Sequence, residues 1–461
     1  MSSYEEIKQK CLQSEKLWKD KNFLLKDIQP VAWKRPKEIV AKPKLFVDGV
    51  ERFDVQQGLL GNCWLLTAIA NLTQHKELFA NVVPADQDFD DNYCGAFYFR
   101  LWNYGEWIGI VVDDLLPTVE GKLAGMHSSV ETEFWSALLE KAFAKFAGSY
   151  VALTKGASSE AMHYLTGGMV QLIQAKARSA LMSCNVYKKG LDNNNGLLHG
   201  HSYSVTDART VPFNLPGWGR TGNVELVRIR NPWGNEAEWK GAWSDTSTEW
   251  ICISKERRKE LGLVFEADGE FWMNMEDFIN NFEALEICHL SPEDLEAVCS
   301  EIEVTSEEST DLQWKTESFH GSWQKGSTAG GCFNHQDTFA SNPQFRVRLT
   351  EPDNLSVDDK CSCIISLIQK HRRQVQEEGK PVLTVGIAVF EIDDENADQN
   401  LGIELLSAEK AVMFSALPNE WGEVCCYIRI EPGNYVVVAS TFEPDEEGEF
   451  FIRIFTKTKV C

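Results

Sequence analysis

Cys63 is the side chain of this 461-residue chain that is best placed for nucleophilic chemistry. It follows the turn-forming segment QQGLLGN and begins CWLLTAIANLT, whose apolar residues recur at helical spacing, so the pattern predicts a helix that starts at the cysteine. Free backbone N–H groups and the positive dipole end of a first turn stabilise a thiolate by about 0.3 to 1 kcal/mol in exposed settings. Because this is too little to activate a thiol, Cys63 needs a base elsewhere, and without one a small buried residue is the simpler interpretation.

Two later segments, LLHGHSYSVTDA and NVELVRIRNPW, are predicted to form antiparallel strands and carry suitable partners. In a strand, His199 and His201 would lie on one face, so either could face a cleft. Asn231 ends the second strand and is suited to accept a hydrogen bond from an imidazole N–H. The order cysteine, histidine, asparagine, with gaps of 138 (201 minus 63) and 30 (231 minus 201) residues, matches papain-like proteases.

Several segments together resemble the calpain family of calcium-dependent, papain-like cysteine proteases. They are QGLLGNCWLLTAIA, GHSYSVTDA, RIRNPWGNEAEWKGAWSD, DGEFWM and WQKGSTAGGC, and the resemblance extends from Phe46 to the end of the chain. It implies that Cys63 is the nucleophile, His201 the general base and then acid, and Asn231 the amide that orients the imidazole. His201 is preferred to His199 because GHSYSV is the context found in the family.

The resemblance assigns roles to two further side chains. Gln57, six residues before Cys63, would donate to the oxyanion together with the Cys63 backbone N–H. Trp233 resembles the wedge residue of the family, which sits between the two lobes without calcium and later covers the triad. By the same resemblance, Lys155 and Gly156 stand where the family often has two glycines, so the edge of the substrate groove is expected to differ.

The resemblance also implies two calcium ions in the protease core, one in each lobe. The first would be held by the carbonyls of Val47 and Gly49 and the carboxylates of Asp54 and Glu133. The second would be held by the carboxylates of Glu238, Asp245, Asp268 and Glu270 and the carbonyl of Glu266. One residue inserted in NPWGNEAEW leaves Glu236 as an alternative to Glu238, and composition alone would make these acids a solvated surface.

The elements that must position these residues predict an α+β fold. Residues 1–45 read as an N-terminal arm, 46–155 as a helical core lobe with the cysteine, and 156–290 as an antiparallel β lobe with the histidine and asparagine. Residues 291–461 read as an all-β sandwich that resembles the C-two type. From residue 301 on this module holds 14 Lys+Arg against 28 Asp+Glu. The whole is a papain-like two-lobed protease core followed by a sandwich.

Composition limits the kinds of partner that the chain is expected to bind and the cell compartment in which it is expected. The net charge of -24, from 45 Lys+Arg and 69 Asp+Glu, disfavours nucleic-acid binding. No apolar stretch approaches the roughly 20 residues of a membrane-spanning helix, and the N-terminus lacks the pattern of a secretory signal, so a cytoplasmic location is expected. Thirteen cysteines without a C-x-x-C pair favour reduced thiols over a disulfide framework or a zinc site.

The C-terminal part departs from the conventional family pattern. Asp394, Asn396 and Asp398 alternate as in an EF-hand loop, but Gln399 and Leu405 stand where glycine and glutamate are required, so a mobile acidic loop is expected. The chain ends at a sandwich strand without a penta-EF-hand domain. It is therefore either an atypical calpain or a truncated form, and no penta-EF-hand small subunit is expected as a partner.

The leading interpretation is a calcium-activated intracellular cysteine endopeptidase that makes limited cuts in protein substrates through a thioester acyl-enzyme. The alternative is a non-proteolytic calpain-like module whose sandwich binds calcium, phospholipid membrane or a protein. The intact Cys63 and His201 argue against it. Acyl transfer to an amine, as in transglutaminases, is disfavoured because those enzymes typically orient the histidine with an aspartate, and this chain has Asn231.

Overall fold

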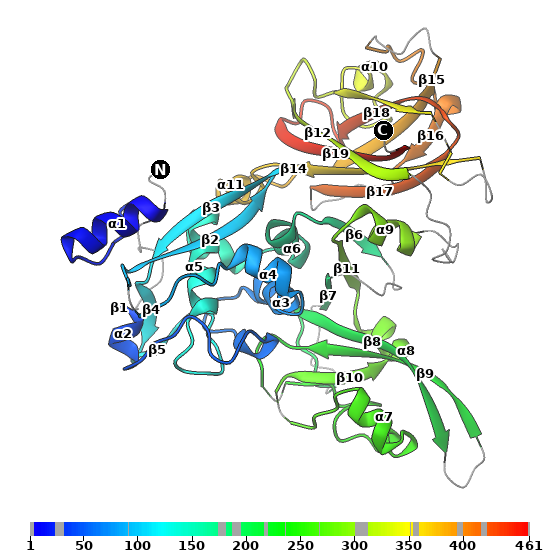
Figure 1. The fold of residues 1–461 in the computed structure, drawn as a ribbon. Helices are drawn as coiled ribbons and strands as arrows, with labels where there is room; N and C mark the ends of the chain where they lie inside the picture. Colours follow the sequence, from blue (N-terminus) through cyan, green and yellow to red (C-terminus); the bar gives the residue numbers. More distant parts are fainter. Residues whose placement is uncertain are drawn as a thin grey trace. The chain divides into compact units, whose positions relative to one another are not determined.

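The computed structural model divides the chain into two compact units (Figure 1). The first comprises residues 1–167 and 172–288, and the second comprises residues 168–171 and 289–461. The structure describes every residue except 1–3, 24–31, 91, 174–180, 187–194, 216–219, 236, 267, 300–311, 351, 354–358, 394–399, 416–421 and 460–461. The predicted EF-hand-like residues Asp394, Asn396 and Asp398, and the alternative ligand Glu236, lie outside the described residues.

The N-terminal part of the first unit combines helices with short antiparallel sheets. Its elements are α1 (Tyr4–Ser14), β1 (Ala32–Lys34), α2 (Pro36–Ile39), η1 (Arg52–Asp54), α3 (Cys63–Leu72), α4 (Lys76–Val82), β2 (Ala96–Asn103), β3 (Glu106–Asp113), β4 (Leu116–Val119), β5 (Lys122–Leu123), α5 (Trp135–Ala147), η2 (Val151–Thr154) and α6 (Ser158–Thr166). The helix predicted from CWLLTAIANLT is confirmed as α3, and the segment TEFWSALLEKAFAKF contains α5. The segment around YGEW forms the turn of the β2–β3 hairpin.

The rest of the first unit is built on an antiparallel sheet. Its elements are β7 (Leu181–Val186), β8 (His201–Leu215), β9 (Arg220–Arg230), η3 (Thr248–Cys252), α7 (Lys255–Glu260), β10 (Glu270–Asn274), α8 (Met275–Asn281) and β11 (Ala284–His289). Strand β6 (Met169–Ile173) begins in the second unit, which holds residues 168–171, and the last residue of β11 also belongs to the second unit. Neighbouring strands run in the order β10-β9-β8-β7-β11. The pairing of Ser204 with Arg230 puts the start of β8 beside the end of β9. A core that includes Tyr203, Ile229 and Phe271 supports this sheet.

The second unit is a β-sandwich. Helix α9 (Pro292–Cys299) precedes the strands, and α10 (Gln336–Phe339), α11 (Arg372–Glu377) and η5 (Ala408–Lys410) lie between them in the chain. The strands are β12 (Leu312–Trp323), β13 (Gln344–Leu349), β14 (Cys361–Gln369), β15 (Val385–Ile392), β16 (Ala411–Phe414), β17 (Glu423–Ile430), β18 (Gly433–Thr441) and β19 (Gly448–Lys459). They form two antiparallel sheets, β12-β19-β14-β17 and β13-β18-β15-β16. Ile365, Val437 and Ile452 lie in the core between them. The predicted α+β fold with an all-β C-terminal part is confirmed.

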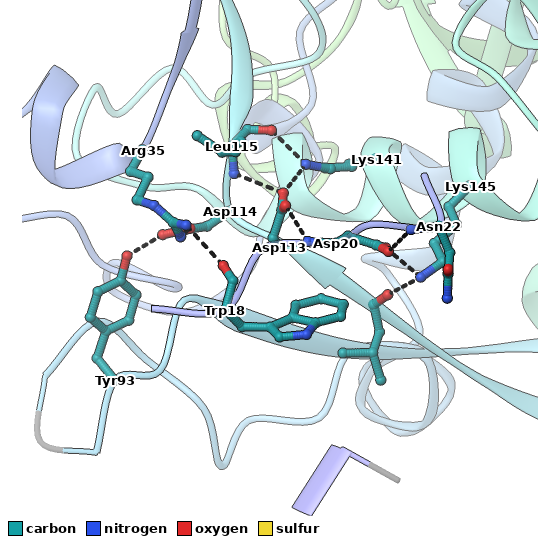
Figure 2. A network of polar contacts seen from close by, with 11 residues as sticks. Trp18, Asp20, Asn22, Arg35, Tyr93, Asp113, Asp114, Leu115, Lys141 and Lys145 are labelled. Atoms are coloured by element: carbon teal, nitrogen blue, oxygen red, sulfur yellow. Dashed lines mark hydrogen bonds and ion pairs between the residues drawn. The ribbon is translucent and has the colours of Figure 1, made fainter. Parts of the chain in front are cut away.

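A buried network of charges holds β3, α5 and the segment after α1 together (Figure 2). The Lys141 ammonium, with no exposed side-chain area, pairs with the Asp113 carboxylate and donates to the Leu115 carbonyl at 2.6 Å. The Asp20 backbone N–H donates to the second oxygen of Asp113 at 2.7 Å, and the Asp20 carboxylate pairs with Lys145. Burial lowers the pKa of Lys141 while Asp113 opposes that shift, so the pair keeps its charges only as long as both members are present.

Two general expectations can be compared with the described residues. None of the helices in that part of the chain is long and apolar enough to cross a membrane. The eleven cysteines that the structure describes are free thiols.

Candidate active site

The nucleophile candidate begins a buried helix. Cys63 is the first residue of α3 and is half-buried, whereas every later residue of the helix is buried. The carbonyl of Asn62 accepts from the N–H groups of Leu65 and Leu66 at 2.9 and 3.2 Å, which starts the helix at this point. The backbone N–H of Cys63 therefore belongs to the first turn, where N–H groups have no partner within the helix.

Helix α3 lies directly against strand β8. Thr67 lies one turn after Cys63, and its hydroxyl donates to the carbonyl of Ser202 at 3.2 Å. In return, the hydroxyl of Ser204 donates to the Thr67 carbonyl at 3.2 Å. Because Ser202 follows His201 in the chain, these contacts bring the start of α3 and the start of β8 into one region.

His201 and Asn231 form a directed pair. The His201 Nε2 and Asn231 Oδ1 atoms are 2.8 Å apart. Asn231 Nδ2 donates to the Ala237 carbonyl at 2.9 Å, and the Trp233 N–H donates to Asn231 Oδ1 at 3.0 Å, so Oδ1 is the acceptor of the amide. Nε2 must then carry the ring proton in neutral His201, which leaves Nδ1 as the basic nitrogen.

Burial keeps this imidazole neutral. His201 is 7% exposed, and burial lowers its pKa to about 4 while the hydrogen bond to Asn231 opposes the shift. Within the described part of the chain, neither the Cys63 sulfur nor His201 Nδ1 has a hydrogen-bond partner. The base is present and oriented, but the contact between the sulfur and Nδ1 is not made.

The other predicted site residues are distributed around this pair. The Trp233 ring is 42% exposed and packs edge-on against the His201 ring, with centroids 5.3 Å apart. The Gln57 backbone N–H donates to the Pro232 carbonyl at 3.1 Å, and its side-chain amide donates to the Leu60 carbonyl at 2.6 Å. The segment that carries Gln57 is thus bonded to the segment that follows Asn231.

One expectation about the histidines is wrong. His199 does not share a strand face with His201, because β8 begins at His201 and His199 lies in the turn before it. The glycine between them has a φ of +66°, a left-handed conformation that interrupts the strand pattern.

The first predicted metal set converges on a pair of carboxyl groups. Asp54 and Glu133 are both buried and lie close enough to affect each other's ionisation. Burial and the neighbouring Asp54 raise the pKa of Glu133 to about 7, and burial also raises that of Asp54. Glu133 accepts from the Val47 N–H at 2.7 Å, and Gly49 lies nearby in the chain with a φ of +111°. Two buried acids that repel each other suit a cation.

In the second predicted metal set, one buried carboxyl oxygen has no hydrogen-bond partner and other ligand candidates accept from backbone N–H groups. Burial, with the charges of Glu238, Asp268 and Glu270, raises the pKa of Asp245 to about 7, and Asp245 Oδ2 is buried without a hydrogen-bond partner in the described structure. Glu238 accepts from the Gly269 N–H at 2.7 Å, and the carbonyl of Glu266 accepts from the Asp268 N–H at 2.9 Å.

Glu270 in this set is already engaged with cations. Its two carboxylate oxygens accept from the Arg52 guanidinium at 2.8 and 2.7 Å. No group of three or more metal-ligating side chains is gathered among the residues described. The donors have the chemistry that a hard cation needs, but they are not drawn together around one point.

Two protein-family models match this chain. The family model described as calpain family cysteine protease matches residues 14–289. The chain belongs to the calpain family of cysteine proteases. A second model, for domain III of the calpain large subunit, matches residues 319–455. The calpain protease core therefore precedes a domain III β-sandwich in this chain.

Three calpains are similar over nearly the whole of this chain. Calpain-A of Drosophila melanogaster is 42% identical and the alignment covers 100% of this chain and 58% of that protein. Calpain clp-1 of Caenorhabditis elegans is 43% identical, covering 98% and 60%. The Calpain-1 catalytic subunit of Mus musculus is 41% identical, covering 99% and 67%. The chain thus spans about three-fifths of the length of the first two of these calpains.

Two buried charged residues of α5 were not predicted from the sequence of this calpain-family chain. Glu140 and Lys141 are buried in α5, although both are ionisable. The available signal was their position in WSALLEKAFAKFA, where apolar residues surround two charged ones in a helix. Such a pattern indicates buried, paired charges rather than a solvated face.

Proposed function

We propose that this calpain-family chain is a calcium-activated cysteine endopeptidase that cuts protein substrates through a thioester intermediate. The observation that carries the proposal is the 2.8 Å contact between His201 Nε2 and Asn231 Oδ1, which leaves Nδ1 as a neutral base in the region where α3 begins. A cysteine, a base and an orienting amide are the parts that an activated thiol nucleophile requires. A cytoplasmic location belongs to the same proposal.

The reaction would proceed in two steps. His201 Nδ1 takes the proton of the Cys63 thiol, and the sulfur attacks the scissile carbonyl carbon. The imidazolium gives its proton to the departing amine as the peptide C–N bond breaks, which leaves a thioester. Water, deprotonated by His201, then attacks the thioester and releases the acid and the thiol. The Cys63 N–H and the Gln57 side chain would stabilise the oxyanion in both steps.

Activation would require a movement of the two halves of the triad. Proximity and orientation supply much of the reduction of the barrier, and the sulfur and Nδ1 are not yet in contact. Calcium, when bound, would supply positive charge that draws oxygen ligands together. The proposed ligands are the Val47 and Gly49 carbonyls with Asp54 and Glu133, and Glu238, Asp245, Asp268, Glu270 and the Glu266 carbonyl. Trp233, packed on the imidazole, would have to shift.

The direct test is cleavage of a casein-like protein by the purified chain while free calcium is varied. The proposal expects calcium-dependent fragments that iodoacetamide abolishes and that the Cys63→Ser variant does not produce. Binding to phospholipid vesicles without cleavage at any calcium concentration would instead support the non-proteolytic alternative, in which the sandwich carries the function.

Replacing Asp54 with asparagine should raise the calcium concentration needed for half-maximal activity by about tenfold or more. Loss of a residue that merely supports a metal ligand typically costs 10- to 100-fold in affinity, and a ligand should cost at least about as much. Because the Asp54 and Glu133 carboxylates repel each other, the thermal midpoint without calcium should not fall. Glu77→Ala, an exposed acid on α4, is the control. An unchanged calcium requirement would contradict this assignment.

Replacing Gln57 with alanine should lower kcat for a peptide substrate about 10²- to 10³-fold, the usual cost of removing one oxyanion donor. The rate at which iodoacetamide alkylates Cys63 should stay nearly constant, because displacement of iodide at a tetrahedral carbon develops no oxyanion. Stopped peptide assays and mass spectrometry of the Cys63 peptide measure the two rates. An equal loss in both would assign Gln57 to the shape of the site and not to the oxyanion.

A further inference from the structure

A buried carboxyl group joins the two chain segments that carry the proposed oxyanion donors. Glu140, on α5, is 1% exposed. Its Oε1 accepts from the Asn62 side-chain amide at 2.7 Å, and its Oε2 accepts from the Met126 backbone N–H at 2.9 Å. No cation pairs with it among the residues of known placement. Burial raises the pKa of Glu140 to about 7. Burying this carboxyl group therefore costs free energy, and no opposite charge beside it offsets that cost.

One of these hydrogen bonds controls the start of the nucleophile helix. Asn62 is the N-cap residue of α3, but its side chain makes no capping hydrogen bond to the helix and reaches Glu140 instead. The peptide group between Asn62 and Cys63 carries the N–H that is proposed as the first oxyanion donor. Fixing Asn62 at both its carbonyl and its amide therefore fixes the direction of that N–H.

The other hydrogen bond controls the segment that carries Gln57. Met126 precedes His127, which exchanges two backbone hydrogen bonds with Gln56, at 2.9 and 3.1 Å. The Leu59 N–H also donates to the Ala124 carbonyl at 2.8 Å. Residues 124–127, called the backing segment below, thus lie against residues 56–59.

The contacts around Glu140 leave no room for adjustment. A Cβ on Gly58 would lie 2.3 Å from the Ala124 carbonyl oxygen, so only glycine lets the two segments approach. A Cβ on Gly125 would lie 2.0 Å from Glu140 Oε2. A shift of the Glu140 carboxyl group must therefore move the backing segment or the start of α3.

We propose that Glu140 is a positioning residue, which sets the Cys63 N–H and the Gln57 side chain at the separation that an oxyanion requires. The inference rests on the proposed function and deepens it. The two donors come from segments that share no backbone hydrogen bond with each other among the described residues. Oxyanion donors act only within about 2.7 to 3.1 Å of the oxygen, and an error of about 1 Å can cost roughly a hundredfold in rate.

The chemistry of the carboxyl group suggests a variant that breaks the link and one that restores it. Glu140→Gln keeps the shape but has one acceptor oxygen for two donors, so Asn62 or Met126 loses its partner. Combining it with Asn62→Asp reverses the polarity of the side-chain pair, because the new amide can donate to the new carboxylate while its oxygen still accepts from Met126. The double variant should recover what the single variant loses.

The experiment compares two reactions of the same sulfur in the full chain with calcium. For Glu140→Gln, kcat for a fluorogenic peptide should fall about 10- to 100-fold, with KM and the rate of Cys63 alkylation by iodoacetamide within about threefold of the unmutated chain. Alkylation forms the S–C bond as iodide leaves and the thiol proton passes to His201, so it reports the nucleophile without the oxyanion. The double variant should return kcat to within about threefold of the unmutated chain, a smaller loss than that of the single variant.

Glu286→Gln is a matched control. Glu286 is 2% exposed, close to the 1% of Glu140, and accepts from one asparagine amide, that of Asn185 at 2.8 Å, and from one backbone N–H, that of Ser159 at 2.5 Å. The Glu286→Gln variant should lower the thermal midpoint as Glu140→Gln does. It should leave the ratio of the rate of peptide hydrolysis to the rate of alkylation unchanged.

Three results would overturn the proposal: hydrolysis and alkylation falling by the same factor in Glu140→Gln, the control changing their ratio equally, or a folded double variant that stays as slow as the single one. If Glu140→Gln does not fold, the ratio of peptide hydrolysis to Cys63 alkylation in the double variant tests the proposal. Failure of the proposed function is distinct, because then the unmutated chain itself would hydrolyse no peptide.

Discussion

Replacing Cys63 with alanine should reduce calcium-dependent peptide hydrolysis by about 10⁴-fold or more, because removal of a nucleophile leaves only binding and oxyanion stabilisation. The thermal midpoint should change little, since Cys63 is half-buried and lies at the end of α3. Fluorogenic peptide assays with active-site titration measure the loss.

The rate losses caused by replacing single members of the triad should not add up, and this provides a control for the Cys63 result. Alanine at His201 should cost about as much as alanine at Cys63, and the double variant should be no slower than either, because the two groups act in one step. Cys252→Ala, at another half-buried thiol of the same unit, should keep full activity. Residual hydrolysis above about one percent in Cys63→Ala would mean that another group attacks the substrate.

Replacing Asp113 with alanine should destabilise the first unit by about 3 to 5 kcal/mol, the usual cost of leaving one member of a buried ion pair alone. Lys141 would remain with no exposed side-chain area and without its paired carboxylate, and the Asp20 N–H would lose its acceptor (Figure 2). Urea unfolding followed by tryptophan fluorescence measures the change.

The pair of Lys44 with Asp88 provides the matched control for Asp113. The Lys44 and Asp88 side chains are 40% and 37% exposed, so the loss of this pair in Asp88→Ala should cost far less stability than Asp113→Ala. An Asp113→Leu/Lys141→Met double variant should regain much of the loss, because apolar replacement of both partners removes the uncompensated charge. If Asp113→Ala were as mild as Asp88→Ala, the network would not be holding β3 to α5.

Local patterns were enough to predict the elements that carry the site. The helical spacing after Cys63 and the turn before it locate the start of α3, and alternation locates β8 and β9 around His201 and Asn231. These features are encoded within a few residues of each position. The start of β8 was the exception, because Gly200 takes a left-handed conformation and excludes His199 from the strand.

The supporting contacts could not be predicted because they join distant parts of the chain. Glu140 meets Asn62 across 78 residues, and Arg52 meets Glu270 across 218. Hydrophobic periodicity marks apolar faces and says nothing about which buried charge pairs with which. The separation of the Cys63 sulfur from His201 Nδ1 is likewise set by the packing of α3 on β8, which no local pattern encodes.

The most direct test of the central claim is to trap the acyl-enzyme. The chain is mixed with calcium and an activated peptide ester, quenched in acid within one turnover, digested and weighed by mass spectrometry. The account expects the acyl group on the peptide that contains Cys63, removable by hydroxylamine and absent in His201→Ala. Turnover of the ester with Cys63 unmodified, or with the acyl group on another side chain, would contradict it.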